Sequence, residues 1–189
     1  MQSRPPVDLA QEQRRILRNS TFALLLCVLV LTAAHWSIPR LFRMPGDDLA
    51  SLLTFWAGCA LLTVLWVVVG FAMVARGRRH SPDDIGGSAF APPSPRIAIP
   101  VAFLQNTLEQ AFIAVIVQIA ILLLVGAQMA ALVAGQVFLF AIGRITFLAG
   151  YPKGAGGRAF GLAVTALPTL AGLVVASGAL VSALLARLM

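Results

Sequence analysis

Residues 97–143 decide the fold: they read IAIPVAFLQNTLEQAFIAVIVQIAILLLVGAQMAALVAGQVFLFAIG and contain one charged residue, Glu109. A membrane-spanning helix needs about 20 predominantly apolar residues. This run has 47 residues, which is too long for a single helix. We therefore expect two antiparallel helices that turn near Gly126, Ala127 and Gln128.

Three further runs carry no charge and are long enough to cross a bilayer, namely residues 19–39, 49–75 and 159–186. The last run contains Pro168, and proline kinks or breaks a helix. Arg144 interrupts the end of the fourth predicted helix, which closes near residues 150–152. The sequence predicts five spans and an all-α integral membrane protein.

The composition supports this fold class. Hydrophobic residues make up 59% of the 189 residues and charged residues 11%, with a mean hydropathy of +0.91. Ordinary soluble domains have about 45–50% apolar and about 25% charged residues. These values exclude a soluble enzyme, a disordered chain and a nucleic-acid module. The net charge is +7, but the basic residues lie beside the apolar runs. That placement indicates a lipid bilayer, and no nucleic acid, as partner.

Lys and Arg also indicate an orientation. With the N-terminus inside, the inner segments hold ten of them and the outer segments three. Cytoplasmic loops carry such an excess, so we predict a cytoplasmic N-terminus. The inner residues are Arg4, Arg14, Arg15, Arg18, Arg76, Arg78, Arg79, Arg96, Lys153 and Arg158, and the outer ones are Arg40, Arg43 and Arg187.

The first span has two possible interpretations. An arginine-bearing segment before a short apolar core is typical of a signal peptide, and Arg14-Arg15 is a weak twin-arginine match. The leader is long and contains Asp8 and Glu12, however, which favours a retained helix. We divide the chain into a cytoplasmic segment (1–18), an additional N-terminal transmembrane helix (19–39) and a four-helix domain (50–187) with a proline-rich inner loop (76–98).

Two ionisable residues lie within the predicted spans, Glu109 and Arg144. Such residues are costly in a bilayer and are kept there by pairing or by function. Asn106 and Glu109 are three positions apart and share a helix face. The helices that carry Glu109 and Arg144 run antiparallel with overlapping depths, so we expect a structural ion pair between these two residues.

The polar residues inside the spans leave two interpretations open. In the first, they act only as interhelical hydrogen-bonding partners. In the second, they line a pocket that opens to the inner face and is closed by Tyr151, Lys153 and Arg158. Tyr151 is the only tyrosine, and it would equally suit an interface anchor.

The remaining candidates carry no chemistry. Cys27 and Cys59 lie inside apolar runs, where we expect free, buried thiols. His35 precedes Trp36 at an outer helix end and suits an interfacial residue. His80 lies in a basic run with no second ligand nearby, so no metal site is predicted. Phosphate-binding loops, dinucleotide fingerprints and hydrolase motifs are absent from the sequence.

Three local patterns resemble the MAPEG superfamily, the membrane-associated proteins in eicosanoid and glutathione metabolism. The first is Asn106-Thr107-Leu108-Glu109, similar to the family's Asn-x-x-Glu early in a helix. The second runs from Arg144 to Gly150-Tyr151, with Arg158 seven residues beyond. The third is the basic helix exit at residues 75–82. In the order and spacing of these patterns, residues 50–187 resemble a divergent bacterial-type member of the family, and the first span is an extra N-terminal helix.

The resemblance implies a homotrimer in a bacterial inner membrane that binds glutathione, as co-substrate, between neighbouring subunits. Arg158 would then be the catalytic residue that stabilises the glutathione thiolate. Arg76 would bind glutathione or polarise the acceptor, which would be a lipophilic small molecule. The other residues assigned to glutathione by the resemblance are Asn106, Glu109, Tyr151 and Lys153.

The sequence also departs from the family pattern. An Arg-Ala pair normally precedes the Asn-x-x-Glu motif, but Ala102 and Phe103 stand there, so a cation for a glutathione carboxylate is missing. Phe147 replaces a family tyrosine. Arg96 is a possible substitute for the missing cation, from a different helical position.

Three functions follow as hypotheses. The first is a glutathione-dependent transferase or peroxidase that acts on lipophilic electrophiles. The second is a noncatalytic MAPEG-like membrane protein that binds a lipid or a protein partner, which the missing Arg-Ala pair favours. The third is a small transporter or proton-linked carrier that uses Glu109 and Arg144.

Overall fold

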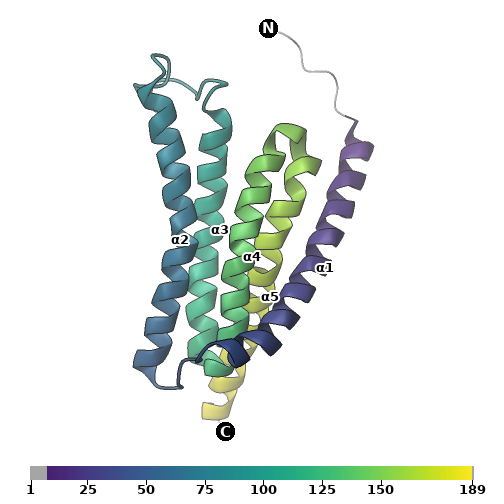
Figure 1. Ribbon diagram of the computed structural model, residues 1–189, viewed down its shortest axis with the longest axis vertical. Helices are drawn as coiled ribbons and strands as arrows, with labels where there is room; N and C mark the ends of the chain where they lie inside the picture. Colours follow the sequence, from purple (N-terminus) through teal and green to yellow (C-terminus); the bar gives the residue numbers. More distant parts are fainter. Residues whose placement is uncertain (1–7, 189) are drawn as a thin grey trace.

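The computed structural model describes residues 8–188, and this part of the chain is helical without any β-strand (Figure 1). The prediction of an all-α protein is therefore confirmed. The helices are α1 (Leu9–Leu41), α2 (Leu49–Arg79), α3 (Ala98–Leu124), the 3₁₀ helix η1 (Ala127–Met129), α4 (Ala130–Gly150), the 3₁₀ helix η2 (Tyr151–Lys153) and α5 (Gly154–Leu188).

Both predicted turns fall where the sequence places them. Gly126 has φ +109° and leads from α3 into η1, a backbone conformation that glycine adopts readily. The Asp47 carboxylate accepts a hydrogen bond of 2.9 Å from the backbone N–H of Ala127 and so closes this end of the bundle. At the other end α4 stops at Gly150, and η2 reverses the chain into α5.

The connections alternate between the two ends of the bundle (Figure 1). The start of α1, the connection from α2 to α3, and η2 lie at one end. The connection from α1 to α2, η1 and the last turns of α5 lie at the other. The segments that the sequence assigns to the inner side therefore share one end of the molecule.

Four helical stretches are long and apolar enough to cross a membrane, not five. They are Leu9–Leu41, Leu49–Arg79, Ala98–Leu124 and Ala127–Leu188. The predicted count of five differs because η2 joins α4 and α5 into one helical stretch of 62 residues. Residues 8–188 thus form an integral, multi-pass membrane protein.

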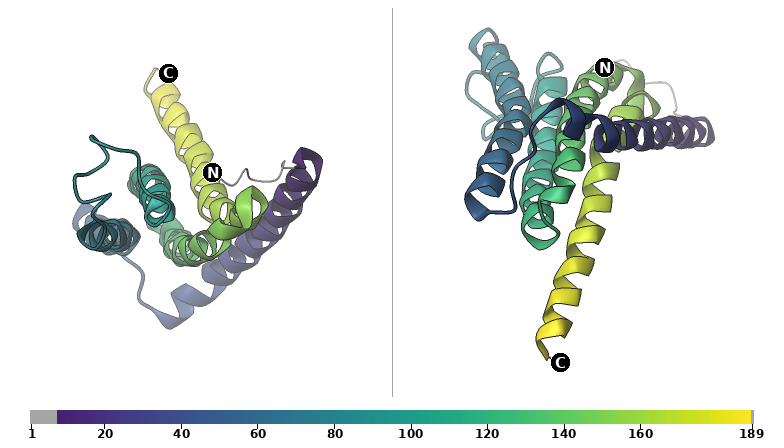
Figure 2. Two further views of the ribbon diagram at one scale, coloured as in Figure 1. Left: turned by 90° about the horizontal axis from the view of Figure 1, so that it is seen from above. Right: turned by 60° about the horizontal axis from the view of Figure 1, so that its bottom comes forward.

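The first helix is longer than predicted, because it begins at Leu9 and not near Asn19. Asp8 caps it: the side-chain oxygen of Asp8 accepts a hydrogen bond of 3.1 Å from the backbone N–H of Gln11. Figure 2 shows that α1 is inclined to the other helices. It lies against α4 and α5, where Ala23 and Cys27 are buried.

Small residues allow α4 and α5 to approach closely. A Cβ atom on Gly161 of α5 would meet the backbone nitrogen of Phe147 in α4, and one on Gly150 would meet the carbonyl of Gly157. Small residues at such crossings let helix backbones pack tightly in membranes. This contact fixes the end of α4 against the start of α5.

We expect Gly161→Ala to destabilise the protein by about 1–3 kcal/mol, because the added methyl group meets backbone that cannot move aside. Gly178, also in α5, is the matched control because, apart from its chain neighbours and the adjoining backbone of its own helix, no atom of the described residues lies within 4 Å of its Cβ position. Gly178→Ala should leave the melting temperature unchanged or raise it, since glycine costs about 0.5–1 kcal/mol relative to alanine inside a helix. Thermal unfolding in detergent compares them. Equal melting temperatures would contradict the close contact.

The loop between α2 and α3 is organised by Asp84, which is buried. Its carboxylate accepts hydrogen bonds of 2.6 Å from the hydroxyls of Ser81 and Ser94, and one of 2.8 Å from the backbone N–H of Ser94. These bonds, the Ser81 hydroxyl first, hold the pKa of Asp84 below its usual value. The loop is therefore a cross-linked connection between the two helices.

A carboxylate with a lowered pKa in the folded state stabilises the protein above its unfolded-state pKa and loses that effect as pH falls through the folded value. The unfolded-state pKa is about 3.9. We therefore expect Asp84→Asn to speed amide exchange in residues 80–97 at about pH 7, relative to the parent protein at that pH. The difference should shrink as the pH falls below the unfolded-state value and through the lower folded-state pKa of Asp84, where the parent carboxyl also becomes neutral. Asp83→Asn, at the exposed neighbouring position, should have no effect at either pH.

Candidate functional site

A polar groove of about 280 Å³ lies between α3, the end of α4 and the start of α5. It brings together four of the predicted site residues, from positions up to 52 apart in the chain. The lining residues are Ala102, Gln105, Asn106, Glu109, Phe147, Tyr151, Arg158 and Leu162. Asn106, Glu109, Tyr151 and Arg158 thus share one site, as the resemblance implies.

Arg144 is bonded to Asn106 of the groove and has no exposed surface. Its Nη1 donates a hydrogen bond of 2.9 Å to Oδ1 of Asn106 in α3. Its Nη2 donates one of 2.5 Å to Oγ1 of Thr165 in α5. The guanidinium carbon lies 4.9 Å from the centre of the Phe147 ring and 5.4 Å from that of Phe140. A single side chain of α4 therefore ties α3, α4 and α5 together.

The predicted ion pair between Glu109 and Arg144 is wrong. Among residues 8–188 the only ion pair joins Arg15 and Glu12, at 3.3 Å. Asn106 lies one helical turn before Glu109 and takes the guanidinium, while Glu109 is exposed and accepts a weak 3.3 Å bond from Gln105. The carboxylate of Glu109 is consequently free to meet a ligand in the groove.

Arg158 is the cation of the groove, and it is half-buried. Its guanidinium carbon lies 4.7 Å from the centre of the Tyr151 ring, within range of a cation–π interaction. The edge of the Tyr151 ring in turn meets Phe147, with ring centres 5.5 Å apart. No carboxylate among the described residues lies within 4.0 Å of Arg158. Its charge therefore faces the groove uncompensated.

The structure does not bring Arg76 or Lys153 into this groove within one chain. Arg76 lines a separate pocket of about 370 Å³ beside His80 and Arg96. Arg96 donates a hydrogen bond of 2.9 Å to the backbone carbonyl of His80, so it does not stand in for a cation near Ala102. Lys153 is exposed on η2.

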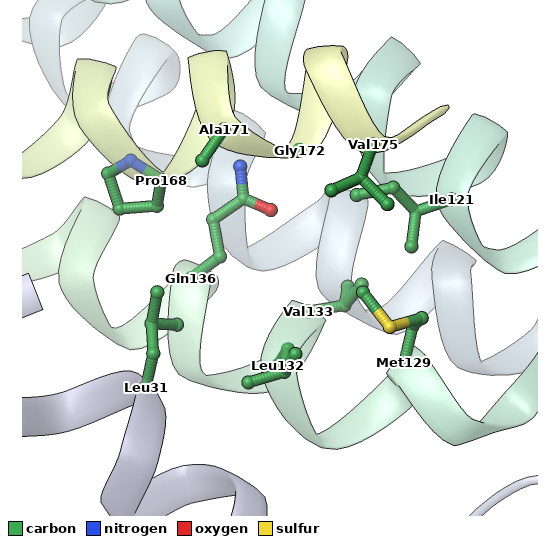
Figure 3. Close-up of a pocket in the computed structure, with 10 residues that line it drawn as sticks. All are labelled: Leu31, Ile121, Met129, Leu132, Val133, Gln136, Pro168, Ala171, Gly172 and Val175. Carbon is green, nitrogen blue, oxygen red and sulfur yellow. The ribbon is translucent and has the colours of Figure 1, made fainter. Parts of the chain in front are cut away.

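A second cavity is apolar and shares no residue with the groove. It has about 130 Å³ and lies where α1, α3, α4 and α5 meet (Figure 3). Gln136 is its one polar side chain, and its amide donates a hydrogen bond of 2.9 Å to Thr169. Cys27 and Cys59 are free, as predicted. The described residues contain no group of three or more potential metal ligands.

Sequence reasoning missed Thr165 as a partner of Arg144. The available signal is the rule that a buried guanidinium needs acceptors on the helices around it. Thr165 and Thr169 are among the few polar residues of the charge-free run 159–186, and both are buried. Thr165 was therefore identifiable as a candidate, although only the three-dimensional arrangement selects it.

These features define an α-helical, multi-pass membrane protein with a polar groove at one end of its bundle. Residues 53–178, about two thirds of the chain, match the model of the MAPEG family, and the protein belongs to that family. The resemblance inferred from the sequence is confirmed, and membership indicates a role in glutathione-related or lipid metabolism. Comparison with curated proteins and with solved structures finds no match.

Asn106→Leu removes the acceptor of Nη1 of Arg144 and leaves a buried charged donor unsatisfied. We expect the protein to lose about 1–3 kcal/mol of stability. Gln105→Leu is the control, because Gln105 is the exposed neighbour and its side chain bonds Glu109, whereas Arg144 bonds Asn106 and Thr165. Thermal or denaturant unfolding in detergent measures both variants. A full-stability Asn106→Leu protein would show that the hydrogen bond to Arg144 is not needed.

Proposed function

We propose that the protein is a glutathione-dependent transferase or peroxidase that acts on lipophilic electrophiles at the membrane. The observation that carries the proposal is the guanidinium of Arg158, which faces the groove without a carboxylate partner. A free thiol has a pKa of about 8.5, and a nearby guanidinium lowers it by favouring the thiolate. The thiolate is the nucleophilic form.

The other groove residues offer matching contacts for glutathione. Oδ1 of Asn106 is occupied by Arg144, so the amide nitrogen of Asn106 is the atom left to donate to a ligand. The carboxylate of Glu109 suits the ammonium group of glutathione. Tyr151 holds the Arg158 guanidinium over its ring and so orients the activating charge. In this proposal, catalysis rests on one cation and on the positioning of the thiol.

We further propose a homotrimer in a bacterial inner membrane, with a cytoplasmic N-terminus. Two findings support this arrangement. The predicted inner segments share one end. Arg76 lies outside the groove of its own chain, which is consistent with a contribution to the groove of a neighbouring copy.

A noncatalytic member that binds a lipid or a protein partner is the second candidate. The specific observation in its favour is Ala102, which lines the groove at the position where the family pattern has the arginine of its Arg-Ala pair. Without that cation, a glutathione carboxylate has only Arg158 as a charged partner in the groove. The two candidates therefore differ in whether glutathione binds at all.

Titration with glutathione, followed by thiolate absorbance, tests the proposal on detergent-purified protein. We expect the thiolate to form in the parent, and its fraction to fall about tenfold in Arg158→Ala for each unit by which the thiol pKa returns toward its free value. Arg187→Ala, at an exposed position at the opposite end of the bundle, should match the parent. Absence of thiolate at millimolar glutathione would contradict the proposal and favour the noncatalytic candidate.

A further inference from the structure

Tyr151 and Arg158 line the groove and also a larger chamber on its other side, which is distinct from the apolar cavity around Gln136. This chamber has about 550 Å³, within the range of about 300–1,000 Å³ for small-molecule sites. Helix α1 supplies one wall through Leu9, Gln13 and Ile16, and α3 supplies Ile99. The Tyr151 ring and the Arg158 guanidinium thus stand between two compartments that share no other lining residue.

The chamber exists because of a helix that the family match does not include. The match begins at residue 53, after α1 has ended at Leu41. The groove, in contrast, is lined only by residues within the match. The second compartment is therefore a feature of this chain and its additional helix.

Helix α1 is fixed to the wall of the chamber by hydrogen bonds. Oε2 of Glu12 accepts a bond of 2.8 Å from the backbone N–H of Gly156, and the amide nitrogen of Asn19 donates one of 2.7 Å to the Gly156 carbonyl. A Cβ on Gly156 would lie 2.7 Å from Cβ of Arg15, so glycine is needed for this approach. Both backbone groups of Gly156, two residues before Arg158, are thereby held by α1.

The character of the two compartments differs. The groove carries Asn106, Glu109 and Gln105 beside Arg158. The chamber has an apolar wall of Leu9, Ile16, Ile99, Pro152 and Ala155. Its polar groups are Gln13, the shared pair Tyr151 and Arg158, and Glu12, whose carboxylate is already bonded to Arg15 and Gly156. Burial of an apolar ligand against such walls is favourable by about 25 cal/mol per Å² of apolar surface. The chamber therefore suits an uncharged, apolar molecule, while the groove suits a charged, polar one.

We propose that the chamber formed by α1 binds the lipophilic electrophile, so that the acceptor meets the thiolate at Arg158 from the side opposite the glutathione groove. This inference rests on the proposed function. With an aryl chloride as acceptor, the thiolate sulfur forms a bond to the ring carbon, the carbon–chlorine bond breaks, and chloride leaves with the bonding electrons. No further reactant is needed, and α1 determines which acceptors enter.

Ile16→Trp fills the chamber and tests the proposal. Leu17→Trp is the control, because Leu17 is the next residue of α1, lies outside the chamber and is 70% exposed. Conjugation of glutathione to 1-chloro-2,4-dinitrobenzene is measured with the thiolate titration for each full-length variant. We expect Ile16→Trp to raise the KM for the aryl chloride by about tenfold or more, equivalent to about 1.4 kcal/mol. Thiolate formation should stay within about twofold of the parent. Ile99→Trp, on the α3 wall, should act like Ile16→Trp.

An unchanged KM in both tryptophan variants, with normal thiolate formation, would overturn the assignment of the chamber. Photolabelling with an apolar aryl diazirine separates that result from failure of the proposed function. In the parent, label should appear on residues 9–16 or 151–158 and be displaced by excess aryl chloride. It should be lost in Ile16→Trp and kept in Leu17→Trp. Displaceable label without thiolate formation would contradict the proposed glutathione activation and leave the chamber assignment standing. Absence of displaceable label would contradict the proposal that the chamber binds the electrophile.

Discussion

A guanidinium that is buried inside a helical bundle needs hydrogen-bond acceptors from the helices around it. The arrangement of α3, α4 and α5 beside the groove depends on the acceptors that Arg144 finds. Its acceptors come from α3 and α5, and the rings of Phe140 and Phe147 cover its faces. An unsatisfied charge in this position would be costly. The three helices are consequently held at the depth where Asn106, Arg144 and Thr165 meet. The groove forms on the same side chains, because Asn106 and Phe147 belong to both.

Two arginines with different roles, Arg144 and Arg158, are connected through the rings of Phe147 and Tyr151. Arg144 is fully buried, with two bonded nitrogens and two aromatic rings within 5.4 Å, so its charge stabilises the packing of the helices. Arg158 is half-buried and rests on Tyr151, with no carboxylate near it among the residues described. Phe147 contacts the ring of Tyr151 and lies under the guanidinium of Arg144. Phenylalanine at this position transmits packing from one arginine to the other without adding a polar group.

The sequence predicts the elements well where a single physical signal decides. Apolar length gives the helices, Gly126 marks the turn between α3 and α4, and residues 150–152 mark the end of α4. Spacing on α3 correctly groups Asn106 with Glu109 on the groove side. The partner of Arg144 was not predictable from its depth in the membrane alone, because Asn106 and Glu109 are one helical turn apart. Which of the two meets Arg144 depends on how each helix is rotated about its axis. Neither was the chamber, because the role of Glu12 and Asn19 depends on the inclination of α1.

The position of Arg158 follows from a sequence of backbone constraints. Gly154 has φ +83°, a conformation that side chains rarely adopt, and it lets η2 turn directly into α5. Tyr151 precedes this turn and Arg158 follows it, and the turn brings the Tyr151 ring and the Arg158 guanidinium into contact. Gly150 and Gly157 then allow the two helix ends to approach, and Gly156 admits α1 on the outer side. A glycine-rich turn, ordinarily the most adaptable part of a chain, is here held by helices on both sides. The Arg158 guanidinium is thereby fixed between the groove and the chamber, where the proposed reaction between a polar thiol and an apolar electrophile would use it.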